Sequence, residues 1–212
     1  MMTPLTILLR RLEHASRSGT VASLVGDGWG AYWRILHPAE RFDGQEYKPV
    51  RWSEIAEARG VDFDPARSTW YEVSGVEPHS DGLARSGIAV EPLEGADDAS
   101  RHRLLIDFLV GSAGDETVGL AEWAGYGDAK PVAGALDVVI AREPYRVLTV
   151  GRDDVPLSTG FRANYAVGDS GLWLVGADMD LMSTYVAVSA SLTLSWPSEL
   201  EVAQCSAGDR LS

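Results

Sequence analysis

Serine and aspartate side chains between positions 168 and 180 are of types, and at spacings, that could do chemistry. The stretch GDSG at residues 168–171 has the pattern of a serine nucleophile loop. A serine nucleophile needs a histidine base, an aspartate that orients the histidine, and donors for the oxyanion. His37 or His79 could stand first along the chain, but Leu172 occupies the position where a second glycine would tighten the loop. We therefore expect residues 168–171 to form a polar turn that leads into a strand.

Asp178 and Asp180 are a second candidate, because residues two apart on a strand point to the same face. Two adjacent carboxylates can bind a hard cation, and one of them can take a raised pKa and act as an acid. A metal-dependent hydrolase that uses this pair is one hypothesis, with Asp62 and Asp64 available to complete the site. Neither pair continues with the ligand positions of a calcium loop. The preferred interpretation is that the first pair ends a strand and that Asp180 caps residues 183–184.

Aromatic side chains are a third candidate, since the chain has seven tryptophans. Trp29 and Trp33 lie four residues apart, and Trp123 stands close to Tyr126. Such residues can line a ligand pocket or form a protein-binding hot spot, whereas core packing is their commoner use. One hypothesis is therefore a small-ligand sensor with an aromatic pocket around Trp29, Trp33 and Trp123. The candidate binding residues are Trp29, Trp33, Trp123, Tyr126, Asp178 and Asp180.

The remaining reactive side chains show no catalytic pattern. The four histidines lack the spacing of zinc ligands on one helix. Cys205, the only cysteine, has no neighbouring histidine or lysine that would lower its pKa, and is expected to be a small buried hydrophobic residue. The glycine clusters at residues 26–30 and 125–127 lack dinucleotide and phosphate-loop fingerprints, and tight turns are expected there. The sequence therefore predicts no catalytic residue, no metal and no cofactor.

Composition and charge limit the classes of partner. The chain has 212 residues, of which 45% are hydrophobic, enough for one domain with a buried core. Its net charge of −13 repels phosphate backbones, which argues against nucleic acid and favours a basic partner. The N-terminal apolar run precedes an arginine pair, the reverse of a secretory signal, and no run approaches the roughly 20 residues of a membrane helix. We expect a cytoplasmic protein with no membrane contact, which agrees with the single cysteine.

Hydrophobic periodicity predicts helices and strands in an irregular order. Helices are expected at residues 4–15, 51–60 and 100–109, and strands at 31–38, 68–75, 117–127, 135–141, 144–151, 171–180 and 199–205. Residues 184–196 are ambiguous, and the acidic residues 77–99 are expected to form a long exposed loop. Because strands and helices do not alternate regularly, an α+β fold is favoured. It would be a single compact domain over residues 1–212, with a mixed or mostly antiparallel central sheet flanked by helices.

Some side chains have expected places within these elements. The first helix should face the core through Leu5, Leu8, Leu9 and Leu12. Ser53 should cap the second helix, and Gly60 should end it. The third helix should turn inward Leu104, Leu105, Phe108 and Leu109. The continuous apolar run in residues 171–180 predicts a central strand that is buried on both faces.

Five short stretches, in the same order along the chain, carry a resemblance to a known group. They are YWRILHPA at 32–39, RWSEIA at 51–56, EWAGYG at 122–127, PYRVLTVG at 144–151 and ADMDLMSTYV at 177–186. These stretches resemble a widespread group of uncharacterised proteins from high-GC Gram-positive bacteria. Members usually continue the Thr-Tyr-Val motif with two glycines, where this chain has Ala187 and Val188.

The resemblance implies one compact cytoplasmic domain and no catalytic residue, because the group has no established activity. The shared residues are mostly tryptophan, proline, glycine and tyrosine, which favours a binding protein over an enzyme. The leading hypothesis is a non-catalytic protein-binding protein with an acidic surface. Its specific form is an immunity protein that neutralises a basic toxin. The metal-dependent hydrolase and the small-ligand sensor remain alternatives.

Overall fold

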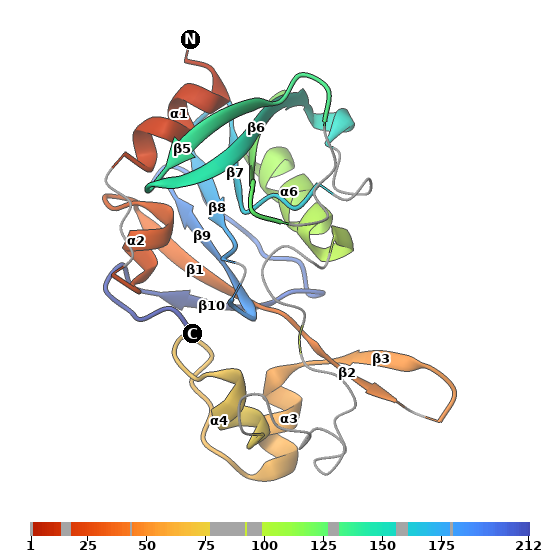
Figure 1. Cartoon of the computed structure of the whole chain (residues 1–212). Helices are drawn as coiled ribbons and strands as arrows, with labels where there is room; N and C mark the ends of the chain where they lie inside the picture. The colour runs from red at the N-terminus through yellow and green to blue at the C-terminus, as the bar shows by residue number, and fades with distance from the viewer. Residues whose placement is uncertain are drawn as a thin grey trace.

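An eight-stranded antiparallel sheet forms the centre of the computed structural model (Figure 1). The structure describes residues 2–13, 18–42, 44–76, 92, 99–126, 132–155, 161–178 and 180–212. The strands of the sheet, from edge to edge, are β10 (Glu201–Cys205), β1 (Ala31–Leu36), β9 (Ser183–Val188), β8 (Trp173–Gly176), β7 (Tyr165–Gly168), β4 (Thr117–Trp123), β6 (Glu143–Gly151) and β5 (Leu136–Ile140). Every neighbouring pair is antiparallel. The expected α+β fold with an antiparallel sheet is confirmed.

Helices cover both faces of this sheet. On one face lie α1 (Pro4–Arg11) and α2 (Val21–Val25), and on the other lies α6 (Ala99–Ala113) (Figure 1). Strand alternation builds a separate core on each face. Tyr32 belongs to the core under α1 and α2, whereas its neighbour Trp33 packs on the core under α6. Of the helices in the described part of the chain, none is long and apolar enough to cross a membrane.

The predicted central strand is also confirmed. All four residues of β8 are buried, and β8 lies fourth from one edge of the sheet. Its neighbours β7 and β9 are buried along their whole length as well. A continuous apolar run is the expected sequence of such a strand, because helices leave neither of its faces in water.

A smaller part of the chain lies beyond the C-terminal end of strand β1 (Figure 1). It consists of the hairpin β2 (Ala39–Phe42) and β3 (Tyr47–Val50), followed by α3 (Trp52–Arg59) and α4 (Trp70–Ser74). Its core centres on Trp52 and Trp70, whose ring centroids lie 5.5 Å apart. The 3-10 helix η1 (Arg152–Asp154) follows β6 on the main body.

The strand expected at residues 68–75 is wrong, because this segment contains α4. Its aromatic and β-branched residues favour a strand, but its ends carry helix signals. The Thr69 hydroxyl accepts the N–H of Glu72, and the Glu72 carboxylate accepts the N–H of Thr69 at 2.7 Å. Gly75 then ends the helix in the left-handed conformation, with φ of 65°. This capping box outweighs the weak strand propensity of five residues.

The cap expected from Ser53 is also wrong, because Ser53 lies inside α3. The cap comes instead from Glu201 on β10, whose carboxylate accepts the N–H groups of Trp52 at 2.8 Å and Ser53 at 2.9 Å. A carboxylate at this end of a helix is favourable because the first N–H groups are unpaired and the helix dipole is positive there. Gly60 ends α3 in the left-handed conformation, as predicted.

The other boundaries differ more modestly. Helix α1 ends at Arg11, four residues earlier than expected, and α6 continues to Ala113, four residues later than expected. Leu104 is exposed on α6, whereas Leu105 and Leu109 are buried as predicted. The ambiguous segment at residues 184–196 begins within strand β9 and continues without a helix or strand after Val188. The predicted loop at residues 77–99 lies almost entirely outside the described residues.

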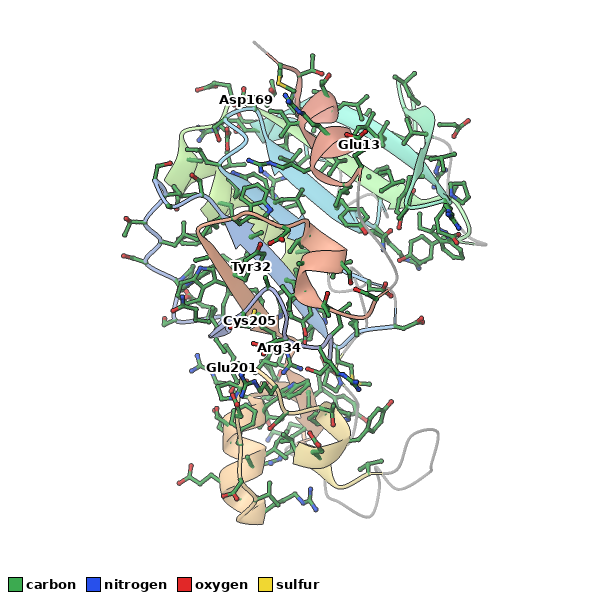
Figure 2. All side chains as sticks on the ribbon, turned by 90° about the vertical axis from the view of Figure 1, so that its left-hand side faces the viewer. Glu13, Tyr32, Arg34, Asp169, Glu201 and Cys205 are labelled. Carbon is green, nitrogen blue, oxygen red and sulfur yellow. The ribbon has the colours of Figure 1, made fainter. Side chains whose placement is uncertain are left out.

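Arg34 is a fully buried arginine on β1, where the sheet meets α3 and α4 (Figure 2). Its Nε donates to the Ser183 hydroxyl at 2.9 Å. Its two terminal nitrogens donate to the main-chain oxygens of Ser68 at 2.8 Å and Ser212 at 2.7 Å. The guanidinium also lies 5.2 Å from the centroid of the Trp52 ring, and burial lowers the pKa of Arg34. One side chain thus joins β1 to β9, to the segment before α4, and to the residues after β10.

The β5–β6 hairpin turns through two strained residues, Ala141 with φ of 51° and Arg142 with φ of 73°. Two-residue turns of this kind prefer Asn-Gly, because left-handed backbone costs about 1–2 kcal/mol for other residues. We expect Arg142→Gly to raise the free energy of unfolding by about 0.5–1 kcal/mol, since the strain relieved exceeds the chain entropy added. Urea denaturation of wild type, Arg142→Gly and Arg142→Ala measures this. Both variants lose the guanidinium, so equal stability of the two would contradict the expectation.

Candidate functional site

The GDSG stretch is a turn between β7 and β8, and buried Asp115 at the end of α6 holds it. The Asp115 carboxylate accepts the N–H of Ser170 at 2.6 Å and the indole N–H of Trp173 at 2.7 Å. Gly168 must be glycine, because a Cβ there would overlap this carboxylate. The Ser170 hydroxyl accepts the N–H of Leu172 at 3.2 Å. The predicted polar turn is confirmed, and the glycine has a packing reason.

His37, the one candidate base that the structure describes, does not stand beside Ser170. The imidazole of His37 contacts the Thr184 hydroxyl at 2.9 Å, near the start of β9. The Ser170 turn precedes β8, whose first residue pairs with Val188 at the end of β9. Ser170 therefore lies near the end of strand β9, whereas His37 lies near its start. His79, the other candidate base, lies outside the described residues.

Asp115 and Asp169 form a pair of interacting carboxyl groups. Burial raises the pKa of Asp115, which is fully buried. Partial burial opposes ionisation of Asp169, but hydrogen bonds with Asp115 and Thr117 outweigh it and lower the pKa of Asp169. The Thr117 hydroxyl donates to Asp169 at 3.0 Å. Of the two carboxyl groups, Asp115 is therefore the one that keeps its proton to the higher pH. Figure 2 shows Asp169 at the end of the sheet remote from Arg34.

A pocket of ≈ 370 Å³ lies between α2, the β5–β6 hairpin and the ends of β4, β7 and β8. Figure 1 shows the tip of this hairpin beside α2. Segments that are far apart in the sequence meet here because β4, β6, β7 and β8 are close neighbours in the sheet. The volume is at the small end of the range for ligand pockets, about 300–1,000 Å³.

The lining of the pocket is acidic, with the carboxylates of Glu143, Asp178 and Asp180. Among the described residues, no lysine, arginine or histidine lines it. Asp178 accepts the N–H of Asp180 at 3.1 Å, which fixes the first carboxylate. Neither aspartate forms an ion pair with any residue that the structure describes. A positive charge placed here would meet carboxylates without competition from a basic side chain of the described lining.

The expected capping by Asp180 is replaced by other contacts. The Ser183 hydroxyl binds Arg34 and the main-chain oxygen of Ser212, and the Thr184 hydroxyl binds His37. The turn is instead closed by Asp178, through the N–H of Asp180. Asp180 is left exposed at the pocket.

The lining also contains the rings of Trp123, Tyr145 and Tyr165, which form its aromatic wall. The two tyrosine ring centroids lie 5.6 Å apart. Burial raises the pKa of Tyr145 to about 12, although its hydrogen bond with Tyr165 opposes the rise and nearby Asp178 adds to it. Burial also raises the pKa of Tyr165, with further contributions from Tyr145 and Asp178. Both phenols are therefore neutral at physiological pH, and the negative charge of the pocket belongs to its carboxylates.

Buried Asn164 positions the aromatic wall. Its side-chain oxygen accepts the N–H of Trp123 at 2.8 Å. Its amide nitrogen donates to the Ala177 carbonyl and to the Tyr126 hydroxyl, both at 3.0 Å. The rings of Trp123 and Tyr126 meet edge to face, with centroids 5.5 Å apart. One amide thus ties the end of β4 to the segment that follows β8 and carries Asp178.

The structure brings four of the six predicted binding residues together. Trp123, Asp178 and Asp180 line the pocket, and Tyr126 adjoins it through Asn164 and Trp123. Sequence reasoning missed four pocket residues, because two lie in or next to the strand expected at residues 144–151 and two lie in a segment for which no element was predicted. They are Glu143, Tyr145, Asn164 and Tyr165. The sequence signal that could have found them is the presence of polar and aromatic residues at the ends of apolar strands.

Trp29 and Trp33 lie elsewhere. The Trp29 indole donates to the Val25 carbonyl at 2.9 Å, and the guanidinium of Arg11 lies 4.1 Å from its ring centroid. Trp33 packs on the opposite face of the sheet against Trp196, with centroids 5.6 Å apart. An aromatic pocket around Trp29, Trp33 and Trp123 is therefore not formed.

The other metal and thiol candidates can now be placed. Asp62 and Asp64 do not line the pocket, and Asp64 caps a turn by accepting the N–H of Ala66 at 3.0 Å. In the described ranges, no group of three histidine, cysteine, aspartate or glutamate residues could hold a metal ion. Cys205 is buried as predicted, and burial raises the pKa of its thiol to about 11.

Comparison with known proteins gives no family for this chain. No family model, no curated protein and no solved structure matches it. The pocket, its charge and its aromatic wall are therefore the features that bear on function.

Proposed function

We propose that this chain is a non-catalytic cytoplasmic binding protein whose basic protein partner docks over the acidic pocket. One observation carries the proposal: Glu143, Asp178 and Asp180 line a pocket that has no basic residue in its described lining. The net charge of −13 adds a field that attracts a basic surface from a distance. A toxin neutralised by an immunity protein is the specific form of partner that we expect.

The chemistry of the pocket favours binding over catalysis. Its described lining contains no histidine, cysteine or lysine, so a base or nucleophile there would have to come from its carboxylates. The one lining hydroxyl on α2, that of Ser23, is occupied in the helix cap with Thr20. Tyr145 and Tyr165 have pKa values raised far from neutrality, so neither exchanges protons readily at physiological pH.

The proposal predicts that two charges in the pocket control the affinity for the partner. The chain would be co-expressed with the proteins encoded beside its gene to find a partner. The partner would then be purified separately and titrated with the chain by calorimetry. We expect the Asp178→Asn/Asp180→Asn double variant to bind about tenfold or more weakly, because charge-assisted contacts contribute about 1.5–3 kcal/mol. Raising the salt concentration should weaken the wild-type complex as well.

A matched control removes the same charge at a distance from the pocket. Asp153 and Asp154 are exposed on η1, at the opposite end of β6 from Glu143. The Asp153→Asn/Asp154→Asn variant should bind within about twofold of wild type, because exposed charges beyond a Debye length act weakly. Failure to form a complex with any neighbouring protein at low salt would overturn the proposed function. Equal weakening by both double variants would show that the pocket is not the contact.

A further inference from the structure

We infer that the pocket is a site for one organic cation, an alkylguanidinium or alkylammonium group whose charged end meets Asp178 and Asp180. The inference rests on the proposed function in taking the pocket as the point of contact, and it adds the chemical class of what enters. It is carried by the combination of two carboxylates with aromatic rings around a volume of ≈ 370 Å³.

The carboxylates fix the sign of the ligand charge. Asp178 uses Oδ1 to accept the N–H of Asp180, and no other described residue donates to either carboxylate. Their remaining oxygen lone pairs are available to a hydrogen-bond donor of the ligand. A phosphate or a carboxylate ligand would be repelled, because the described lining contains no cation to receive it.

The aromatic wall distinguishes an organic cation from a metal ion. Calcium and magnesium take six or more oxygen ligands, and rings offer them none. A guanidinium or ammonium group, in contrast, is attracted to ring faces while its carbon stem packs on apolar surface. Trp123, Tyr145 and Tyr165 supply these rings, and Leu24 and Leu211 supply apolar surface.

The phenols strengthen the case because they remain neutral. The charge of Asp178 reaches both Tyr145 and Tyr165, and it disfavours a second negative charge at either phenol. The rings therefore border the carboxylates as neutral surfaces that present no fixed cation. The side chain of Asn164 helps to fix this arrangement, since its amide is bonded to Trp123, Tyr126 and Ala177.

Two sources could deliver this chemistry: an arginine or lysine side chain of a partner protein, or a free amine. The small volume suits either, because each presents one charged group on a short, unbranched stem. Guanidinium has the better match of the two groups, since its planar fork can bond a carboxylate through two nitrogens and stack on a ring.

The test is calorimetric titration of the full chain with butylguanidinium, butylammonium, uncharged butylurea and anionic butyrate. We expect both cations to bind, butylguanidinium more tightly, and butylurea and butyrate to bind at least about tenfold more weakly. Asp178→Asn/Asp180→Asn should weaken butylguanidinium binding about tenfold or more, and Asp153→Asn/Asp154→Asn should leave it within about twofold. Trp123→Leu should weaken it about two- to fivefold, through the lost ring contact.

Butylurea that binds as well as butylguanidinium, or no binding of either cation, would overturn the inference. If the complex with a basic protein still forms in that case, the proposed function stands and only the pocket ligand is wrong. A blocked arginine tripeptide that binds more tightly than butylguanidinium assigns the source to a protein side chain. Tighter binding of free 1,4-diaminobutane than of the tripeptide assigns it to a small amine. Because Asp180 is exposed, Asp180→Asn alone provides a variant that should fold and still weaken the cation.

Discussion

An Arg34→Met variant is expected to lose about 3–5 kcal/mol of unfolding free energy. The loss comes from buried acceptors, since the guanidinium serves the Ser183 hydroxyl and the main-chain oxygens of Ser68 and Ser212. Each buried acceptor left without a donor costs about 1–3 kcal/mol, whereas removing the desolvated charge returns part of that cost. Methionine fills similar space but donates no hydrogen bond. Urea denaturation followed by far-ultraviolet circular dichroism measures the loss.

Two comparisons separate the hydrogen bonds of Arg34 from a general effect of charge. Arg41→Met removes an exposed guanidinium on β2, and should change stability by no more than about 0.5 kcal/mol. Arg34→Lys keeps the charge, but one ammonium group cannot donate to all three acceptors of the guanidinium. We therefore expect an intermediate loss of unfolding free energy. An Arg34→Met variant as stable as Arg41→Met would contradict the view that Arg34 joins the sheet to the smaller part of the chain.

Asp115→Ala is expected to cost about 2–4 kcal/mol of stability. The carboxylate is fully buried and accepts from Ser170 and Trp173, whose N–H groups would then lack a partner. A glycine at position 168 offers no side chain to fill the space. Asp115→Asn keeps one acceptor and the volume of the side chain, so a loss of about 1 kcal/mol is expected for it. Thermal and urea unfolding of the two variants check the order, and an alanine variant as stable as the asparagine variant would refute it.

The same residue should give stability a particular pH dependence. Because burial raises the pKa of Asp115, its contribution is fully present below the pKa of an unfolded aspartate and is lost as the pH rises through its folded-state pKa. Asp169, whose pKa is lowered, contributes above the unfolded pKa and loses that contribution as the pH falls through its folded-state pKa. The advantage of wild type over Asp115→Asn should therefore be largest near about pH 4 and shrink as the pH rises. Unfolding curves at stepped pH measure this advantage. An advantage that grows with pH would contradict a raised pKa of Asp115 in the folded state.

Local patterns explain which elements the sequence predicted well. Strand β8 is recognisable because a short continuous apolar run is the expected sequence of a strand buried on both faces. Helix α4 was predicted as a strand, since its aromatic residues were weighed above the Thr69–Glu72 capping box. The cap of α3 could not be predicted, because Glu201 is 149 positions from Trp52 and only the fold brings them together. Boundaries and caps thus depended on contacts that no local pattern contains.

The residues of the candidate site were likewise predicted only in part from the sequence. Trp123, Asp178 and Asp180 were selected by residue type from separate arguments, and the sheet order places them at one pocket. Trp29 and Trp33 were paired by a four-residue spacing that is meaningful on a helix. Trp33 lies on a strand, where alternation directs it to the face opposite the core that contains Trp29. Packing of strands that are distant in the sequence, which spacing does not encode, therefore decided which candidates share a site.

The most direct test of the pocket is a nuclear magnetic resonance titration of the labelled chain with butylguanidinium. The indole N–H signal of Trp123 and the side-chain amide signals of Asn164 should shift with ligand concentration, because both residues line the pocket. The indole signals of Trp29 and Trp33 should stay unchanged, since neither residue lines the pocket. The account predicts saturable shifts at Trp123 and Asn164 that disappear in Asp178→Asn/Asp180→Asn. Shifts confined to Trp29 or Trp33, or equal shifts with butylurea, would contradict it.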